Sequence, residues 1–244
     1  RELDGTAVER LRSRLPTRSV DPESAAAAVR EACSPLTPGG AIVGSVVPRL
    51  DLAWREAIRD ILGRDPLFVS HALELGIGIR YPRPARIGAD RLANASGAAD
   101  RYGVPVVVAD FGTALTFDVI DTNAMYVGGV IAPGLPVMTD YLSEKTALLP
   151  RISLRGRLGQ VGKSTEGAMR IGAKIGYRGM VREIVEHLAE GLDSPDTALC
   201  ATGGYARWVL GGLNMPFHFD PDLTLYGLAR IHALNDAGRT ADNL

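Results

Sequence analysis

The chain has 244 residues, enough to bury a sizeable core as one large domain or two smaller ones. Its 27 basic residues are balanced by 28 acidic ones, so it has no basic field that could hold a nucleic-acid backbone. Two cysteines are too few for a disulfide framework, and neither a signal peptide nor an apolar run of about 18 residues occurs, so we expect a cytoplasmic protein with no membrane partner.

The first half of the chain alternates short apolar runs with amphipathic segments. Residues 7–15 have the pattern of a hairpin strand after the Asp4-Gly5 turn, and we expect another strand before it. Asp21 is a suitable N-cap for the first helix. The pattern predicts helices at 22–32, 52–62 and 89–102, strands at 41–47 and 66–70, and an extended segment at 73–81.

The second half repeats this alternation. The pattern predicts strands at 106–109, 115–120, 126–131 and 199–202, and helices at 135–148, 165–192 and 223–234. The long helix carries glycines that lower its propensity, which predicts close approach of another backbone, and apolar residues that predict a packed face. These glycines are Gly167, Gly172, Gly176 and Gly179, and the apolar residues are Met169, Ile171, Ile175, Met180, Val181 and Ile184. We expect an N-terminal lobe at 1–102 and a C-terminal lobe at 103–244, with a hinge near Tyr102-Gly103.

Two short stretches place a carboxylate beside a backbone turn. Asp110 follows the apolar run at 104–109 and precedes Gly112, which would let a phosphate approach the backbone closely. Asp90 and Arg91 stand at the beginning of a predicted helix, where bound anions are favoured. Together the stretches predict phosphoryl transfer at a nucleotide site.

The order and spacing of several motifs resemble the type III pantothenate kinases, a family of the acetate and sugar kinase, actin and heat-shock chaperone superfamily. The resemblance implies an α/β fold of two similar ribonuclease-H-like (actin-like ATPase) lobes with an interlobe cleft. It also implies transfer of the ATP γ-phosphate to the hydroxyl of pantothenate, giving 4′-phosphopantothenate in the first step of coenzyme A biosynthesis. The motifs are Ser45-Val46-Val47-Pro48, Gly88-Ala89-Asp90-Arg91, residues 110–116, residues 128–134, Leu149-Pro150, residues 162–165, Ala201-Thr202-Gly203-Gly204 and residues 220–224.

By this resemblance Asp90 is the general base that takes the proton from the pantothenate hydroxyl. Such a carboxylate can accept the proton late in a loose transition state, so its position matters more than its basicity. Arg91 resembles the arginine that binds the substrate carboxylate or positions phosphate, which suits a planar guanidinium. The alternatives are a helix-start aspartate stabilised by the helix dipole and a solvated helix arginine.

Other residues are assigned to pantothenate by the same resemblance. Gly88 and Ala89 belong to the substrate motif, and Tyr81 resembles an aromatic that lines the pantothenate pocket, although it could equally be a rim tyrosine. Thr165 resembles a substrate-contacting threonine supplied across a homodimer, whose interface then contains the substrate site. Alternatively Ser164 or Thr165 caps the long helix, and both roles are compatible.

The nucleotide side is assigned in the same way. Asp110 resembles the residue that helps to hold a monovalent cation, K⁺ or NH₄⁺, through oxygen ligands, while Mg²⁺ arrives with ATP. A glycine pair after a strand could also be a plain strand-to-helix turn. The residues implied to bind ATP are Gly112, Thr113, Thr116, Gly203 and Gly204.

The sequence also departs from the family pattern. The family's first phosphate loop, an Asp-x-Gly-Asn-Thr turn, is not found in residues 1–20, and we expect it roughly 15 to 20 residues upstream of Arg1 from typical strand and turn lengths. Arg83 and Tyr226 replace residues more usual in the family, an asparagine and a glutamate. Besides an active pantothenate kinase, the sequence therefore allows a catalytically silent binding or regulatory relative, or a superfamily kinase that acts on another hydroxylated acid or sugar.

Overall fold

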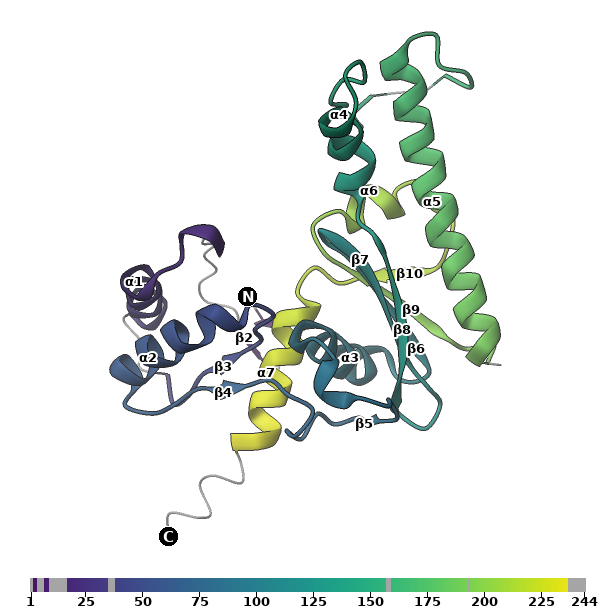
Figure 1. The fold of residues 1–244 in the computed structure, drawn as a ribbon. Helices are drawn as coiled ribbons and strands as arrows, with labels where there is room; N and C mark the ends of the chain where they lie inside the picture. Colours follow the sequence, from purple (N-terminus) through teal and green to yellow (C-terminus); the bar gives the residue numbers. More distant parts are fainter. Residues whose placement is uncertain are drawn as a thin grey trace. The chain divides into compact units, whose positions relative to one another are not determined.

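The structure is a computed structural model that describes residues 2–3, 7–8, 17–34, 38–156, 159–192 and 194–236 (Figure 1). The chain divides into two compact α/β units, which confirms the predicted fold class. Unit 1 comprises Arg1–Gly97 and Leu223–Leu244, and unit 2 comprises Ala98–Asp222.

The division falls inside helix α3 (Ala89–Tyr102), earlier than the boundary expected after Tyr102, and it groups helix α7 (Leu223–Asp236) with unit 1 rather than with the second lobe. The reason is a glycine contact between the two helices. A Cβ placed on Gly227 of α7 would lie 1.8 Å from the carbonyl oxygen of Ala93 in α3. Only glycine permits this approach, which packs α7 against α3.

Unit 1 begins with the short 3₁₀ turn η1 (Thr17–Ser19) and helix α1 (Pro22–Cys33). The predicted cap is confirmed: Asp21 Oδ1 accepts the Ser24 N–H at 2.8 Å, and Ser24 Oγ accepts the Asp21 N–H at 2.9 Å. Helix α2 (Asp51–Leu62) ends at Gly63, which adopts a left-handed conformation with a φ of 70°. Helices α1 and α2 pack against each other.

Four of the described strands of unit 1 form two separate pairs. Strand β1 (Glu2–Leu3) pairs antiparallel with β2 (Ala7–Val8), and β3 (Ile42–Val43) pairs parallel with β4 (Leu67–Phe68). The predicted strand at 41–47 is shorter because Ser45 Oγ accepts the Val47 N–H at 3.2 Å, a local turn that competes with strand pairing. Residues 9–15 of the predicted hairpin strand lie outside the described residues. The remaining elements here are β5 (Gly78–Ile79) and the 3₁₀ turns η2 (Pro48–Leu50) and η3 (Pro84–Arg86).

The strands of unit 2 lie side by side in the order β10-β9-β6-β7-β8. Strands β6, β7 and β8 form an antiparallel meander, while β9 runs parallel to both β6 and β10. This is the strand order of the predicted ribonuclease-H-like lobe. The bounds are Val106–Phe111 for β6, Ala114–Ile120 for β7, Met125–Pro133 for β8, Ala198–Thr202 for β9 and Phe217–Phe219 for β10.

The helices of unit 2 cover this sheet. The predicted helix at 135–148 contains the π-helical turn η4 (Val137–Tyr141) and ends with α4 (Leu142–Lys145), and the short α6 (Ala206–Leu210) follows β9. Helix α5 (Thr165–Leu192) has the predicted bounds and packs on the sheet. Its buried residues are Ala173, Tyr177, Val181 and Val185, which join a core with Val107, Ala109 and Phe111 of β6.

Two predictions about α5 are confirmed only in part: Val181 is buried and Met180 and Ile184 pack against the core, and the Gly162 backbone lies 3.7 Å from the Cβ position of Gly167. A Cβ on Gly172, Gly176 or Gly179 would meet nothing within 4 Å, so no backbone of the described residues approaches these three glycines. Ile175 was expected on the packed face, yet it is 66% exposed because it lies away from the side that carries Tyr177. None of the described helices is long and apolar enough to cross a membrane.

Candidate active site

The start of α3 in unit 1 holds the carboxylate expected to act as the base. Asp90 is half-buried, and its Oδ1 accepts the N–H of Arg91 at 2.8 Å. A Cβ on Gly88 would lie 2.5 Å from this oxygen, so the carboxylate turns back over Gly88. The glycine that precedes the helix therefore provides the room in which Asp90 is held, and buried Ala89 anchors the first turn.

The loop after β3 lies against the same turn. Val46 Cγ1 is 3.6 Å from the Cβ position of Gly88, which brings the motif at 45–48 next to the motif at 88–91. Ser45 donates a hydrogen bond to the Asp51 carboxylate at the start of α2, and this bond fixes the loop. Tyr81 belongs to the same unit and is 38% exposed in the segment between β5 and η3. Arg83, two residues later, is also exposed.

In unit 2, the end of β6 presents the second carboxylate. Asp110 is half-buried and pairs in register with Thr116 of β7. Gly203, directly after β9, has a φ of 94°, and a Cβ there would lie 2.5 Å from Asp110 Oδ1 and 2.6 Å from the Phe111 nitrogen. The Tyr205 N–H donates to the Phe111 carbonyl at 3.1 Å. The glycine turn after β9 is thus packed directly on the Asp110 carboxylate.

The hairpin between β6 and β7 lies at the same end of the sheet, where β6 and β9 finish. Gly112 donates its N–H to the Ala114 carbonyl at 3.1 Å, and Thr113 is exposed at the tip. A Cβ on Gly134 would lie 2.0 Å from the Thr113 carbonyl oxygen, so the residue after β8 packs directly against the hairpin. Gly204 is exposed, with nothing within 4 Å of its Cβ position. The predicted ATP-binding residues of unit 2 therefore lie at one end of the sheet, where β6 and β9 finish.

The surroundings of Asp110 fit a hard cation. A carboxylate and backbone carbonyls are oxygen donors, which monovalent and alkaline-earth cations prefer. The missing side chain of Gly203 leaves the space beside Asp110 Oδ1 that a Cβ would fill. No group of three or more His, Cys, Asp or Glu side chains suited to a metal ion occurs in the described part of the chain.

Thr165 is the first residue of α5 and is exposed. The capping role falls to its neighbour, because Ser164 Oγ accepts the Gly167 N–H at 3.1 Å. Figure 1 shows the first turns of α5 extending beyond the strands of unit 2, beside α4. Thr165 therefore belongs to the part of α5 that extends beyond the strands.

Sequence reasoning gave no role to a buried polar cluster in unit 2. Asp220 accepts hydrogen bonds from Arg101 at 2.5 Å, from the Tyr102 hydroxyl at 3.1 Å and, through its other oxygen, from the Asp222 N–H at 3.0 Å. Burial and then the charge of Asp220 raise the pKa of the neighbouring Cys200 thiol to about 12. The cluster joins the end of α3 to the segment before α7. Asp220 stands in a family motif, but only the tertiary structure brings Arg101 to it.

The strand order of unit 2, with a carboxylate at the end of its first strand and a glycine turn after its fourth, is that of a ribonuclease-H-like lobe. A family model described as type III pantothenate kinase matches residues 6–187, and the chain belongs to this family.

Individual relatives agree with this assignment. A type III pantothenate kinase of Akkermansia muciniphila is 47% identical over 221 residues, which cover 91% of this chain and 88% of that protein. One of Acidiphilium cryptum is 42% identical over 81% of this chain and 74% of its own length. A solved structure from Campylobacter jejuni, described as a conserved putative Baf family transcriptional activator, has a TM-score of 0.58 at 19% identity, and covers 82% of this chain and 85% of its own. This last similarity supports the fold alone.

Proposed function

We propose that the protein transfers the γ-phosphate of ATP to the hydroxyl of pantothenate and forms 4′-phosphopantothenate, the first step of coenzyme A biosynthesis. Its membership of the type III pantothenate kinase family carries the proposal. The geometry agrees, because the family's carboxylate motifs appear as an ordered helix start in unit 1 and an ordered strand end in unit 2. No feature of the described residues favours a silent relative or another acceptor.

Asp90 acts on the acceptor. Its carboxylate takes the proton from the pantothenate hydroxyl as that oxygen attacks the γ-phosphorus and the bond to ADP breaks. In a loose transition state the proton moves late, so a carboxylate held in place by Gly88 and the Arg91 N–H serves as base. Arg91 binds the pantothenate carboxylate or positions phosphate with its planar fork. Gly88 and Ala89 shape the turn, and Tyr81 lines the pantothenate pocket.

The end of the unit 2 sheet that carries Asp110 binds ATP. Gly112, Thr113 and Thr116 contact the phosphates, and the Gly203-Gly204 turn receives the adenosine side. Asp110 holds a monovalent cation, K⁺ or NH₄⁺, which lowers the repulsion between phosphate oxygens, and Mg²⁺ enters with ATP. These roles are supported by the proximity of Asp110, the hairpin and the glycine turn, which lie at one end of the sheet.

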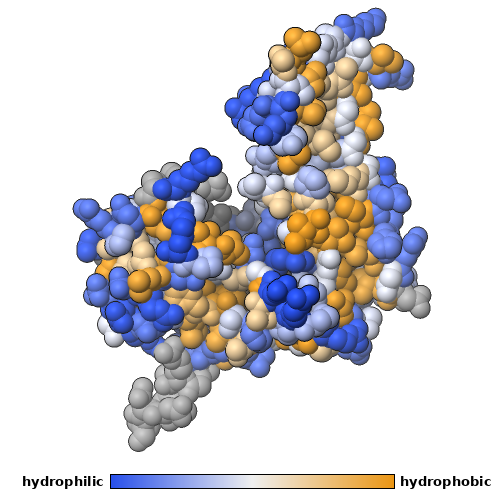
Figure 2. Space-filling model, viewed as in Figure 1, coloured by the Kyte–Doolittle hydropathy of each residue, from blue (hydrophilic) through white to orange (hydrophobic). Residues whose placement is uncertain are grey.

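A homodimer completes the proposal. Helix α5 leaves Gly172, Gly176 and Gly179 open along its length, and apolar residues are exposed on and around it. Figure 2 shows apolar residues interspersed over the α4 and α5 region. The most exposed of them are Leu148, Val161, Ile131, Ile175 and Tyr141. Contact between two such helices would supply the approaching backbone that the glycines predict, and Thr165 would then reach the substrate of the partner subunit. We place this enzyme in the cytoplasm, as its unpaired cysteines favour.

A steady-state assay of ADP formation with pantothenate, Mg²⁺-ATP and K⁺ tests the proposal. We expect Asp90→Asn to lower kcat by about 10²- to 10⁴-fold, the usual contribution of a general base, with an unchanged unfolding midpoint. Asp100→Asn, the same substitution at an exposed position of the same helix, is the matched control and should keep full activity. Activity retained by Asp90→Asn would remove the base assignment. A preference for a sugar in a panel of hydroxylated acceptors would remove pantothenate.

A further inference from the structure

A buried ion pair in unit 2 has no role in the proposed reaction so far. Arg101 donates to Asp220 Oδ2 at 2.5 Å, and the two side chains are 11% and 6% exposed. The Tyr102 hydroxyl donates to the same oxygen at 3.1 Å, and the Asp222 N–H donates to Oδ1 at 3.0 Å. Both oxygens of the carboxylate are therefore bonded, and they join two segments that lie far apart in the chain.

Stability alone is a weak reason for burying such a pair. Removing two charges from water is costly, and apolar side chains of similar volume often stabilise a fold equally well or better. Charge-assisted hydrogen bonds to a guanidinium are directional, so they restrict the groups that they join to one geometry. The position that this pair fixes is that of the Asp220 backbone.

The backbone of Asp220 is bonded to the end of β9. Asp220 directly follows β10, and its N–H donates to the Ala201 carbonyl at 2.8 Å. This bond continues the pairing of Phe219 with Ala201, so it holds β9 on the side opposite β6. The next residue of β9, Thr202, is 2% exposed and pairs in register with Asp110 of β6.

The end of β9 leads directly into the glycine turn of the proposed ATP site. The Cβ position of Gly203 lies 2.5 Å from Asp110 Oδ1, and the Tyr205 N–H donates to the Phe111 carbonyl at 3.1 Å. The turn is thus in contact with β6 on one side, while the strand that precedes it is held from the other side by Asp220. A shift of β9 away from β6 would separate the turn from the Asp110 carboxylate.

We propose that Arg101 and Asp220 are positioning residues for ATP binding. Their ion pair holds the end of β9 at the separation from β6 at which Gly203 meets Asp110. This inference rests on the proposed role of this end of the sheet in binding ATP. Because the pair acts through the glycine turn, its loss should weaken ATP binding and leave the affinity for pantothenate unchanged.

Calorimetric titration of Mg²⁺-ATP into the full chain tests the proposal. Arg101→Met removes the guanidinium and keeps most of the apolar stem. We expect it to raise the Kd for ATP by about tenfold or more, since small displacements of binding groups can cost up to about 10²-fold. Arg101→Lys keeps the charge and should recover most of the affinity. Arg64→Met, which breaks the ion pair of 3.2 Å with Asp236 in unit 1, is the matched control and should leave the Kd unchanged.

Amide hydrogen exchange separates positioning from a purely structural role. The Asp220 N–H is bonded to Ala201, and the Tyr205 N–H is bonded to Phe111 across the glycine turn. We expect Arg101→Met to speed exchange at both amides. Faster exchange at Asp220 with an unchanged rate at Tyr205 would overturn the proposal, because the pair would then stabilise only its own surroundings.

A milder variant covers the case in which Arg101→Met fails to fold. Tyr102→Phe removes one hydrogen bond to the carboxylate and keeps the ring that stacks on His218, with centroids 5.0 Å apart. It should change the ATP affinity and both exchange rates in the same direction, by a smaller factor.

Three further outcomes would overturn the proposal. One is an unchanged ATP affinity in a folded Arg101→Met protein whose unfolding midpoint is lower, because the pair would then be structural. Another is an equal loss of affinity for ATP and for pantothenate, and the third is no recovery by Arg101→Lys. Calorimetry with ATP and amide exchange need no pantothenate, so their failure is distinct from failure of the proposed kinase activity.

Discussion

At the level of single residues, Gly203 combines two requirements that only glycine meets. Its φ of 94° is unfavourable for any side chain, and a Cβ would press on Asp110 Oδ1 and on the Phe111 backbone. We predict that Gly203→Ala destabilises the fold by about 1–3 kcal/mol, the usual cost of such strain, and weakens ATP binding by displacing the Asp110 carboxylate. Chemical denaturation and ATP titration measure the two effects.

Its neighbour provides the control for that prediction. A Cβ on Gly204 meets nothing within 4 Å, so Gly204→Ala should leave stability nearly unchanged. If both variants lost the same stability, the contact between Gly203 and Asp110 would not be the cause. If Gly203→Ala lost stability but kept its ATP affinity, the turn would be structural and Asp110 would act elsewhere.

A second residue, Cys200, makes stability depend on pH. Burial, followed by the charge of Asp220, raises its pKa from 9.0 to about 12. The folded state therefore keeps a proton that the unfolded state releases, so the stabilisation is complete below pH 9 and is lost as the pH rises toward 12. We predict that the free energy of unfolding falls in this window by up to about 1.4 kcal/mol per pH unit for this group.

Urea denaturation at half-unit steps from pH 8 to 10 checks this prediction. Tyr177, whose pKa burial raises from 10.0 to about 12, contributes chiefly above that range. Cys200→Ala should therefore reduce the slope between pH 9 and 10, even though the cavity lowers stability at every pH. An identical slope in the variant and the parent would mean that the thiol does not control this dependence.

A secondary-structure element could be predicted from the sequence where the interactions that fix its bounds lie within the segment itself. Helices α3 and α5 have the predicted bounds because helical periodicity and end signals such as the Ser164 cap lie within the segment itself. Strand β3 is shorter than predicted because its length depends on pairing with β4 and on the Ser45 turn. The π-helical turn η4 has no signal in the apolar pattern.

The contact between α3 and α7 is another cause that the sequence pattern does not contain. Gly227 lies against the Ala93 carbonyl, a backbone atom that no side-chain rotation can move. We predict that Gly227→Ala destabilises unit 1 by about 1–3 kcal/mol or more, as overpacking does, and a thermal melt measures it. Gly191→Ala, in the open last turn of α5, should instead be neutral or stabilise by up to about 1 kcal/mol. Equal tolerance of both changes would contradict the close crossing.

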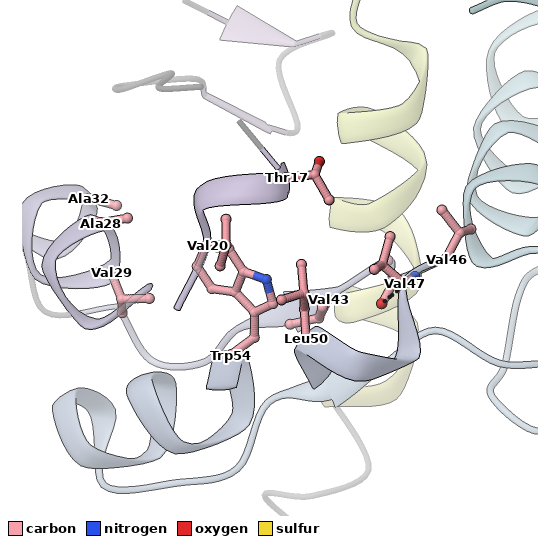
Figure 3. A pocket seen from close by; sticks show the side chains of 12 residues that line it. Thr17, Val20, Ala28, Val29, Ala32, Val43, Val46, Val47, Leu50 and Trp54 are labelled. Carbon is pink, nitrogen blue, oxygen red and sulfur yellow. Dashed lines mark hydrogen bonds between the residues drawn. The ribbon is translucent and has the colours of Figure 1, made fainter. Parts of the chain in front are cut away.

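At the scale of the whole molecule, the candidate site could be predicted wherever its residues follow one another in the chain. The motif at 88–91 and the hairpin at 110–116 are continuous, and the structure orders each of them as a single turn. The contacts of Gly134 with Thr113 and of Arg101 with Asp220 join distant segments, so no local pattern reveals them. The hydrophobic groove beside α1 and α2 in unit 1 is likewise built from separate segments (Figure 3).

The open glycine face of α5 leads to a prediction about assembly. Ile175 is 66% exposed in the single chain, and the proposed dimer would bury it. We predict that Ile175→Glu raises the dimer Kd by more than tenfold, because burying an unpaired carboxylate costs more than the 1.4 kcal/mol, roughly, that a factor of ten requires. Sedimentation velocity measures the Kd. Leu234→Glu, at a 40% exposed position of α7, is the matched control and should leave it unchanged.

The same variant separates assembly from nucleotide binding. If the partner's Thr165 contacts pantothenate, monomeric Ile175→Glu should lose pantothenate turnover. Its affinity for ATP should stay the same, because ATP binding depends on the end of the unit 2 sheet around Asp110. Raising the protein concentration should restore turnover in proportion to the dimer that re-forms. A fully active monomer would show that each chain completes its own substrate site, and Thr165 would then be only the first residue of a helix that Ser164 caps.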